Sequence, residues 1–237
     1  MAEVLNRVIE KAFRGSAPAQ INVPRDYWTQ VIDIELPPIV RFERQGGGKD
    51  AIDRASNLLS KAKFPVILSG AGVVIGGAIE ECKKLAEKLD APVCNGYQHN
   101  DSFPGSHPLA VGPLGYNGSK AAMELISKAD VVLALGTRLN PFSTLPGYGI
   151  DYWPKNATII QVDMNPDRIG LTKKVTVGIC GDAKQVAQQI LDKLSSDAGN
   201  LGRDERKNLI HKTKSAWLQT LAGLDHEEDD PGTVWNK

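Results

Sequence analysis

The chain has 237 residues, and its 28 lysines and arginines balance its 28 aspartates and glutamates, so the formal net charge is zero. This length allows one large or two small domains, and the charge balance leaves no field to attract nucleic acid or an anionic membrane. No run approaches the ~20 apolar residues of a membrane span, and Cys82, Cys94 and Cys180 lie too far apart for a zinc site or a disulfide framework. We therefore expect a soluble, cytoplasmic protein with buried thiols and no metal site.

The first 40 residues predict elements that cannot bury a core by themselves. Apolar residues between positions 4 and 12 recur on one face of a helix of about three turns, and APAQINVP at 17–24 has the pattern of a strand ended by proline. One helix and one strand are too few for an independent core, so we expect 1–40 to be the end of a preceding domain. The run RFERQGGGK at 41–49 is typical of a linker.

From residue 50 onward, short apolar strands alternate with helices. The predicted strands are 65–69, 92–95, 131–135, 158–162 and 175–179. The predicted helices are 51–62, 78–89, 119–128 and 182–194, with long loops at 96–118 and 139–155. Such alternation, with right-handed crossovers, places helices on both faces of a parallel sheet. We predict an α/β fold with a Rossmann-like doubly wound parallel sheet of five to six strands, followed by a polar helix from 203 to about 224 and an acidic tail.

The first of these strands ends in a glycine turn. Ser69-Gly70-Ala71-Gly72 stands between a strand and a helix, the context in which a Gly-x-Gly has meaning. The third glycine of a dinucleotide fingerprint would fall at Ile75, and no acidic residue ends the next strand, so we do not expect an ordinary NAD site. A tight structural turn and a variant phosphate or flavin-nucleotide loop are both open.

A second turn, Gly136-Thr137-Arg138, follows the strand 131–135. It offers a glycine for close approach, a hydroxyl and a fixed cation, and arginine suits bidentate recognition of phosphate; an ion pair between Arg138 and Asp163 is the alternative. Asp163 ends the strand 158–162, where it could accept a hydrogen bond from a ribose hydroxyl, although we expect it to cap the turn that follows.

Two further regions hold polar side chains. Gly181-Asp182-Ala183, with Asn208 downstream, faintly resembles an element that holds magnesium and a diphosphate, but its third glycine is missing, so we expect Asp182 to be the N-cap of the helix it opens. The loops 97–108 and 140–153 carry histidines, amides and aromatic residues. Long loops of this kind are functional or interfacial, and we interpret both as surfaces that cover a partner domain.

The order of these motifs resembles a known superfamily. The segment from about 50 to 195 has its motifs in the order strand–SGAG–helix–LAEKLDAPV–loop–VGPLGYNG–ADVVLALGTRL–IIQVDMNP–GDAKQVAQQIL. This order is similar to that of the central domain of thiamine-diphosphate-dependent enzymes of the acetohydroxyacid synthase and pyruvate oxidase group. The resemblance implies that 1–40 is a remnant of the pyrimidine-binding domain, 41–198 the central domain, and 199–237 a helical and acidic linker toward a pyrophosphate-binding domain.

Several loops, including GYQHNDSFPGSHPL and RLNPFSTLPGYGIDYWP, resemble the branch of this superfamily that transfers an acetyl group from sulfoacetaldehyde to phosphate. That resemblance implies thiamine diphosphate and Mg²⁺ as cofactors of the whole enzyme, sulfoacetaldehyde and phosphate as its substrates, and a homo-oligomer. It also places the catalytic glutamate and the metal–diphosphate motif on flanking domains, so we expect no catalytic residue in this chain and no acetyltransferase activity of the chain alone.

The resemblance also assigns candidate site residues. The positions that correspond to a flavin or adenine nucleotide site in relatives are Gly70, Gly72, Gly136, Thr137, Arg138 and Asp163, and we expect that site to be vestigial here. His99 and His107 are candidates for the entrance of the active site in the intact enzyme. The central domain of an acetohydroxyacid synthase-like enzyme and a free-standing nucleotide-binding module are the alternative interpretations.

Overall fold

The computed structural model describes residues 2–15, 17–35, 38 and 43–224, which fall into two compact units, Met1–Glu43 and Arg44–Lys237. The predicted acidic tail lies outside the described residues. In the first unit, α1 (Ala2–Gly15) confirms the predicted amphipathic helix, and a short 3₁₀ turn, η1, follows at Arg25–Thr29. The strand predicted at 17–24 is wrong: these residues form no strand, and in the described part of the chain they pair with no other strand to complete a ladder.

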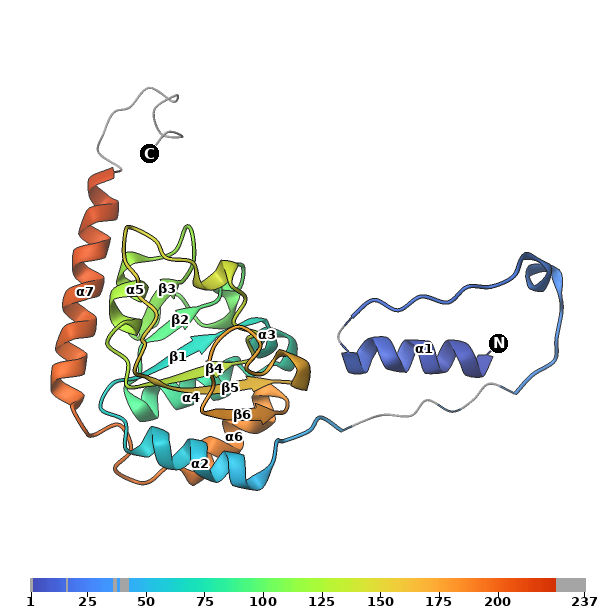
Figure 1. Cartoon of the computed structure of the whole chain (residues 1–237), viewed down its shortest axis with the longest axis horizontal. Helices are drawn as coiled ribbons and strands as arrows, with labels where there is room; N and C mark the ends of the chain where they lie inside the picture. Colours follow the sequence, from blue (N-terminus) through green and yellow to red (C-terminus); the bar gives the residue numbers. More distant parts are fainter. Residues whose placement is uncertain (1, 16, 36–37, 39–42, 225–237) are drawn as a thin grey trace. The chain divides into compact units, whose positions relative to one another are not determined.

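The second unit is built on one sheet of six parallel strands (Figure 1), which confirms the predicted fold class. The strands are β1 (Pro65–Ser69), β2 (Val93–Asn95), β3 (Ala110–Pro113), β4 (Val131–Leu135), β5 (Thr158–Asp163) and β6 (Val177–Cys180). Their order is β3-β2-β1-β4-β5-β6, and all five pairings are parallel. The chain therefore builds the sheet outward in both directions from β1 and β4, the pair at which the strand order reverses.

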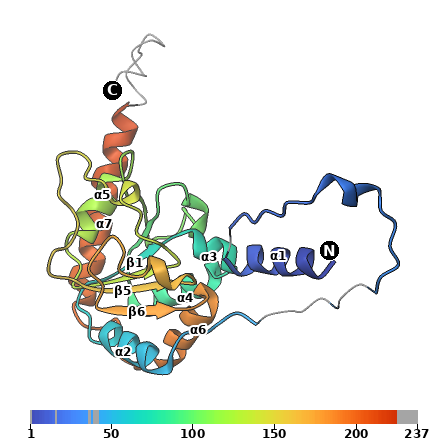
Figure 2. The ribbon, with the colours of Figure 1, turned by 45° about the vertical axis from the view of Figure 1, so that its right-hand side comes forward.

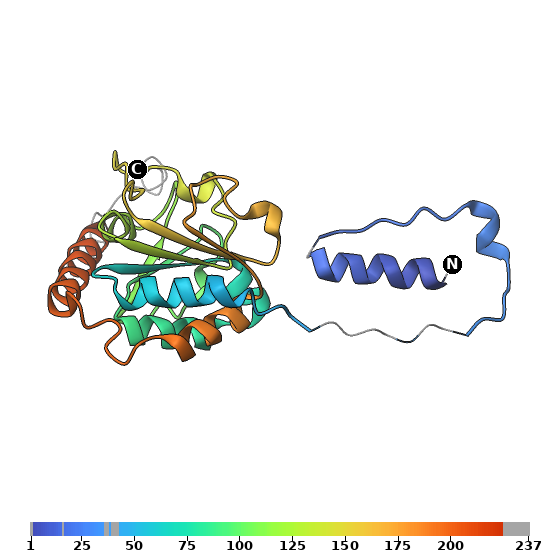
Figure 3. The ribbon, with the colours of Figure 1, turned by 60° about the horizontal axis from the view of Figure 1, so that its bottom comes forward.

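Helices cover both faces of this sheet, as a doubly wound fold requires (Figures 2 and 3). One face is covered by α2 (Lys49–Ser60), α4 (Ile79–Leu89) and α6 (Ala183–Lys193). The other is covered by α5 (Lys120–Ile126), the first half of α7 (Arg203–Leu224) and parts of the long loops. The short helix α3 (Ala71–Gly76) was not predicted; it follows β1 directly and ends at Gly77, whose φ of 64° is left-handed. No described helix is both long and apolar enough to cross a membrane.

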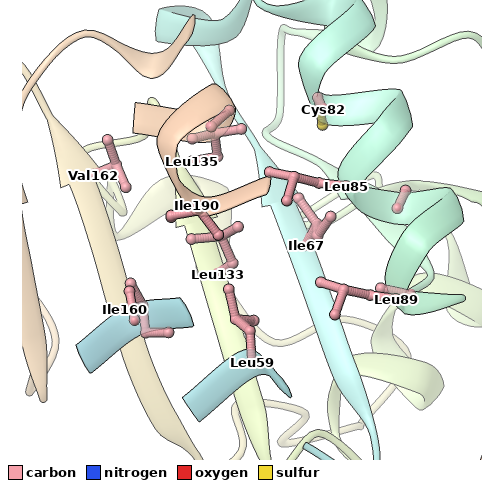
Figure 4. Close-up of a cluster of buried hydrophobic side chains, with 14 of the residues drawn as sticks. Leu59, Ile67, Cys82, Leu85, Leu89, Leu133, Leu135, Ile160, Val162 and Ile190 are labelled. Atoms are coloured by element: carbon pink, nitrogen blue, oxygen red, sulfur yellow. The ribbon is translucent and has the colours of Figure 1, made fainter. Parts of the chain in front are cut away.

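The core forms because strand side chains alternate between the two helical layers. On the face shown in Figure 4, Leu133 and Leu135 of β4 lie between Ile67 of β1 and Ile160 of β5, and they pack under helices α2, α4 and α6. Val132 and Ala134 point to the opposite layer. Every residue of β1 and β4 is buried, as the unbroken apolar runs predicted for strands covered on both sides.

Two differences from the predicted elements affect the surface of the domain. The loop predicted at 96–118 contains β3, a four-residue edge strand whose register with β2 shifts between Val93 and Cys94. The glycine-rich run is also more than a tether, because the Asp182 N–H donates to the Gln45 carbonyl at 2.8 Å and Gly47, at φ 82°, lies so close to Ile179 that a Cβ would be 2.6 Å from it. The glycine there permits close packing against the end of β6.

Candidate functional site

The two predicted glycine turns leave the sheet side by side. Ser69, the last residue of β1, is in register with Leu135, the last residue of β4. The turns that follow therefore meet at the carboxyl edge, at the point where the strand order reverses, which is where open α/β sheets bind ligands. The structure thus brings Gly70, Gly72 and the Gly136–Arg138 turn together, and it places Asp163 at the end of the neighbouring strand β5.

Three backbone N–H groups at the first turn already have protein partners. Gly70 donates to the Leu135 carbonyl at 3.0 Å, and Gly72 donates to the Gly136 carbonyl at 2.8 Å. Val73 donates to the Gly70 carbonyl at 3.0 Å. A phosphate-binding loop needs such N–H groups to point at the ligand, so these three cannot serve a phosphate without losing bonds within the protein.

The same turns touch each other backbone to backbone. A Cβ at Gly72 would lie 2.7 Å from the Gly136 Cα, and a Cβ at Gly70 would lie 2.6 Å from the Thr137 Cβ. Gly136 itself has a φ of 61°, in the left-handed region that disfavours any residue with a Cβ. We call this contact of Gly70, Gly72 and Gly136 the glycine joint. It accounts for all three glycines by packing alone.

The polar residues around the joint mainly fix the local backbone. The Thr137 hydroxyl accepts from the Leu139 N–H at 3.2 Å. The Asp163 carboxylate accepts from the Asn165 N–H at 2.9 Å, which confirms that it caps the turn after β5. Arg138 is exposed, and within the described ranges it makes no ion pair, so the alternative pairing with Asp163 does not form.

Gln161 organises this edge and was not singled out from the sequence. Its side chain is buried, with 1% of the residue exposed. The amide nitrogen donates to the carbonyls of Thr137 at 3.1 Å and Arg168 at 3.2 Å, and the amide oxygen accepts from the Gly170 N–H at 2.9 Å. A glutamine in the middle of the apolar run IIQVD was the available signal, since a buried amide must find hydrogen-bond partners.

The two candidate histidines lie at opposite edges of the sheet. His99 follows β2 at the carboxyl edge, where its carbonyl accepts from the Asn95 side chain at 3.3 Å. His107 precedes β3 and is therefore at the amino edge. Its Nδ1 accepts from the Leu109 N–H at 3.2 Å, and its Nε2 lies 3.3 Å from a carboxylate oxygen of Glu87. The contact with Glu87 joins the loop to α4, and the structure does not bring His107 near the glycine joint.

Asp182 uses both carboxylate oxygens within the domain. Oδ1 accepts from the N–H groups of Lys184 at 3.1 Å and Gln185 at 3.2 Å, which confirms the predicted N-cap of α6. Oδ2 accepts from Arg44 at 3.1 Å. Among the described residues, no group of three or more His, Cys, Asp or Glu side chains could hold a metal ion. The residues present therefore do not fit a magnesium–diphosphate group.

The buried thiols and phenol are poor nucleophiles. Burial raises the pKa of the Cys82 thiol to about 12, and burial also raises the pKa of Cys94. Burial likewise raises the pKa of the Tyr152 hydroxyl to about 12. All three groups are neutral at physiological pH, and the thiolate is the reactive form of cysteine, so they contribute to packing rather than to chemistry.

Comparison with known proteins places these features in a wider group. Residues 52–190 match the family model described as the central domain of thiamine pyrophosphate enzymes. The chain is 79% identical, over 99% of its length, to a probable sulfoacetaldehyde acetyltransferase of Rhizobium meliloti (strain 1021), and it covers 40% of that protein. It is 75% identical over its whole length to the sulfoacetaldehyde acetyltransferase of Roseovarius nubinhibens, of which it covers 39%.

More distant proteins share the fold. A probable acetolactate synthase large subunit of Methanocaldococcus jannaschii is 35% identical over 87% of the chain, which covers 34% of that protein. The crystal structure of benzoylformate decarboxylase from Polynucleobacter necessarius superposes with a TM-score of 0.60 and 24% identity, over 76% of this chain and 33% of that one. The chain therefore spans about 40% of the length of the two acetyltransferases that it matches.

Proposed function

The chain belongs to the thiamine pyrophosphate enzymes through their central domain, and from this premise we propose that it is the central part of an acetyltransferase that acts on sulfoacetaldehyde. The observation that carries the proposal is the contrast in identity: 79% to a named acetyltransferase, against 35% to an acetolactate synthase subunit. The match to the acetyltransferase covers 99% of the chain, whereas the match to the acetolactate synthase subunit covers 87% of it.

The reaction proposed for the whole enzyme converts sulfoacetaldehyde and phosphate into acetyl phosphate and sulfite. The C–S bond breaks and its electron pair leaves with sulfite. The aldehyde C–H bond breaks, its hydrogen leaves as a proton, and a bond forms between that carbon and a phosphate oxygen. The former CH₂ takes up a proton and becomes the methyl group. Atoms and electrons balance without an external oxidant, so a flavin would have no net redox step to perform. Thiamine diphosphate would supply the electron sink for the aldehyde carbon.

Within that enzyme, the role proposed for this chain is that of a scaffold. Thiamine diphosphate and Mg²⁺ would be held by parts of the enzyme other than the described residues, because Asp182 is fully engaged as a helix cap and as a partner of Arg44. The domain limits 41–198, a segment at 199–237 that leads toward a further domain and whose helix α7 packs on the central domain, and a homo-oligomeric whole enzyme are parts of this proposal. A cytoplasmic location is also proposed, supported by three free cysteines.

The six nucleotide-site positions are proposed to be vestigial. In support, Gly70, Gly72 and Val73 spend their N–H groups on protein carbonyls, and the glycine joint leaves no room for a Cβ. Among the six positions, the charged side chain of Asp163 caps a turn, whereas that of Arg138 is exposed and makes no ion pair with a described residue. Titration of the chain with FAD and with ADP should show no binding in the micromolar range, and saturable micromolar binding of either would overturn this assignment.

A segment exchange tests the acetyltransferase assignment. The 75% identical segment of the Roseovarius nubinhibens enzyme is replaced by this chain, and the chimera is assayed for sulfite release and acetyl phosphate formation. We expect an active chimera and an inactive isolated chain. The matched control inserts the corresponding segment of the Methanocaldococcus jannaschii subunit, which should not support sulfite release.

Three results would contradict the proposal. Turnover by the isolated chain would show that the described residues are sufficient for catalysis. A chimera that assembles normally but releases no sulfite would argue against the substrate. A chimera that forms acetolactate from pyruvate would favour the acetolactate synthase interpretation.

A further inference from the structure

Helix α7 docks on the domain through polar contacts at the amino edge of the sheet. Arg206 is 1% exposed, and its guanidinium donates to five backbone carbonyls, those of Lys63, Leu89, Asp90, Gly199 and Leu201. Two turns further along the helix, the Lys214 ammonium donates to the Pro108 carbonyl at 2.8 Å. Residues of α7 that follow Lys214 at i+3 and i+4 spacing lie on the same face of the helix. The helix runs alongside α5 toward the opposite edge of the sheet (Figure 1).

At that opposite edge, α7 meets the loop 139–155. The rings of Trp217 and Tyr148 are 5.7 Å apart at an interplanar angle of 65°, an edge-to-face contact. The Tyr148 hydroxyl donates to the Gly118 carbonyl at 3.0 Å. One side chain therefore joins three segments: the loop 139–155, the turn before α5, and α7.

The backbone of Tyr148 is strained. Its φ is 53°, in the left-handed region that residues with a Cβ rarely adopt, and the next residue, Gly149, has a φ of 70°. Such a conformation persists only where surrounding contacts impose it. The Ile150 N–H donates to the Gly147 carbonyl at 2.9 Å and closes this turn. The Tyr148 side chain adds the contacts with Trp217 and Gly118, which hold the turn against α7 and against the segment before α5.

We propose that Tyr148 is a positioning residue that couples the conformation of the loop 139–155 to the position of α7. We call its contact with Trp217 the aromatic clasp. Beyond the clasp, α7 continues past the sheet (Figure 1) with Leu218 59% exposed. A displacement of the C-terminal end of α7 would move the loop through Trp217, because Arg206 fixes the N-terminal end of the helix to the domain. The loop also contacts a second segment of the carboxyl edge, since Phe142 packs edge-on against Tyr97 at 5.1 Å.

This coupling does not depend on the proposed acetyltransferase activity, and hydrogen exchange on the whole chain tests it directly. Loss of the ring contact in Trp217→Ala should accelerate amide exchange in peptides from the loop 139–155 by about 3- to 10-fold, while peptides from β1 and β4 are unchanged. Trp217→Leu keeps apolar bulk and should give the same local effect should the alanine variant prove poorly folded. The matched control is Leu218→Ala, at the next and more exposed position of the helix.

Tyr148→Phe separates the two contacts. It keeps the ring and removes the hydroxyl, so it should accelerate exchange in the loop and in the turn around Gly118 by about 2- to 10-fold, the loss of one hydrogen bond. The proposal is overturned when the loop exchanges at the wild-type rate in both Trp217 variants. It is equally overturned when exchange in β1 and β4 rises by the same factor as in the loop, because that pattern reports global destabilisation.

Discussion

Replacing Gly136 with alanine perturbs the glycine joint at its tightest point. The new Cβ would lie 2.7 Å from both the Gly72 Cα and the Val73 nitrogen, distances at which backbone must move. Left-handed backbone costs an alanine about 1–2 kcal/mol, and forcing an atom into a packed site costs about 1–3 kcal/mol. The unfolded chain returns about 0.4–1 kcal/mol, because alanine has less freedom to lose than glycine. The net expectation is a loss of about 1–5 kcal/mol in the free energy of unfolding.

Gly170→Ala is the matched control. Gly170 has a φ of 73°, and no atom lies within 4 Å of a Cβ built there. The two variants share the backbone strain and the effect on the unfolded chain, so the difference between them isolates the packing of the joint, about 1–3 kcal/mol. For a domain of this size, about 1 kcal/mol corresponds to a change of about 2–4 °C in Tm.

Guanidinium unfolding followed by circular dichroism measures both variants against the wild type. Equal losses, within about 0.5 kcal/mol, would refute the reasoning, because they would show that the two turns can separate and that the joint is not a packed contact. A wild-type stability for Gly136→Ala would refute it more strongly.

Three further outcomes are expected. Arg206→Met should cost about 3–5 kcal/mol in urea unfolding, because three buried and two part-buried hydrogen bonds to carbonyls lose their charged donor. Arg203→Met, which removes a 45% exposed partner of Asp90, should cost less than about 1 kcal/mol, and similar losses for the two variants would contradict this. A thiol reagent at pH 8 should modify Cys180 in the folded protein and all three cysteines after unfolding. Rapid labelling of Cys82 or Cys94 in the folded Cys180→Ser variant would be inconsistent with buried neutral thiols. Burial raises the pKa of Cys82 from its ordinary 9.0 to about 12 in the folded protein. The stability that the neutral thiol contributes is therefore complete below pH 9 and is lost as the pH rises toward 12. Cys82→Ala should flatten that decline in a pH series of unfolding curves, and an unchanged slope would rule out this role of Cys82.

The strands at the centre of the sheet were predictable because burial on both faces leaves a simple pattern. PVILS and VVLAL are apolar throughout, and β1 and β4 occupy the predicted residues. The edge strand β3 gave no such pattern, since AVGP is short, contains Gly112 at φ 92° and ends in proline. The position of His107 depends on β3, which explains why the sequence could not show that this residue lies at the amino edge.

The glycine turns illustrate a different limit. A turn that cradles a phosphate and a turn that packs on its neighbour both need glycine, because both require close approach and left-handed backbone. The residues are the same in the two cases, and the difference lies in what accepts the N–H bonds. For Gly70 and Gly72 the acceptors are Leu135 and Gly136, residues more than sixty positions away in the chain. Only the register of β1 with β4 reveals them.

Arg206 shows why a polar helix can still be an integral part of the fold. In the sequence it is one of several charged residues in RDERKNLIHKTK, and nothing nearby distinguishes it from the exposed Arg203. Its five acceptors come from three separate places: the start of β1, the end of α4 and the loop before α7. The carbonyls of Leu89, Asp90 and Gly199 would otherwise be buried with an unmet hydrogen bond. One guanidinium therefore satisfies a requirement that arises only in the assembled domain.

The two edges of the sheet therefore hold their segments by different means. At the amino edge, charged side chains satisfy carbonyls, and Arg206 and Lys214 fix the start of α7. At the carboxyl edge, the glycine turns after β1 and β4 pack against each other in the glycine joint. The surface available to a ligand or a flanking domain is therefore formed by the long loops rather than by these two turns. Tyr148 is the point at which the two arrangements connect, because it binds a carboxyl-edge loop to a helix that is anchored at the amino edge. A displacement of α7 must then either break the aromatic clasp or move the loop. The Trp217 variants remove the clasp, so their hydrogen exchange measures how far the conformation of the loop depends on that contact.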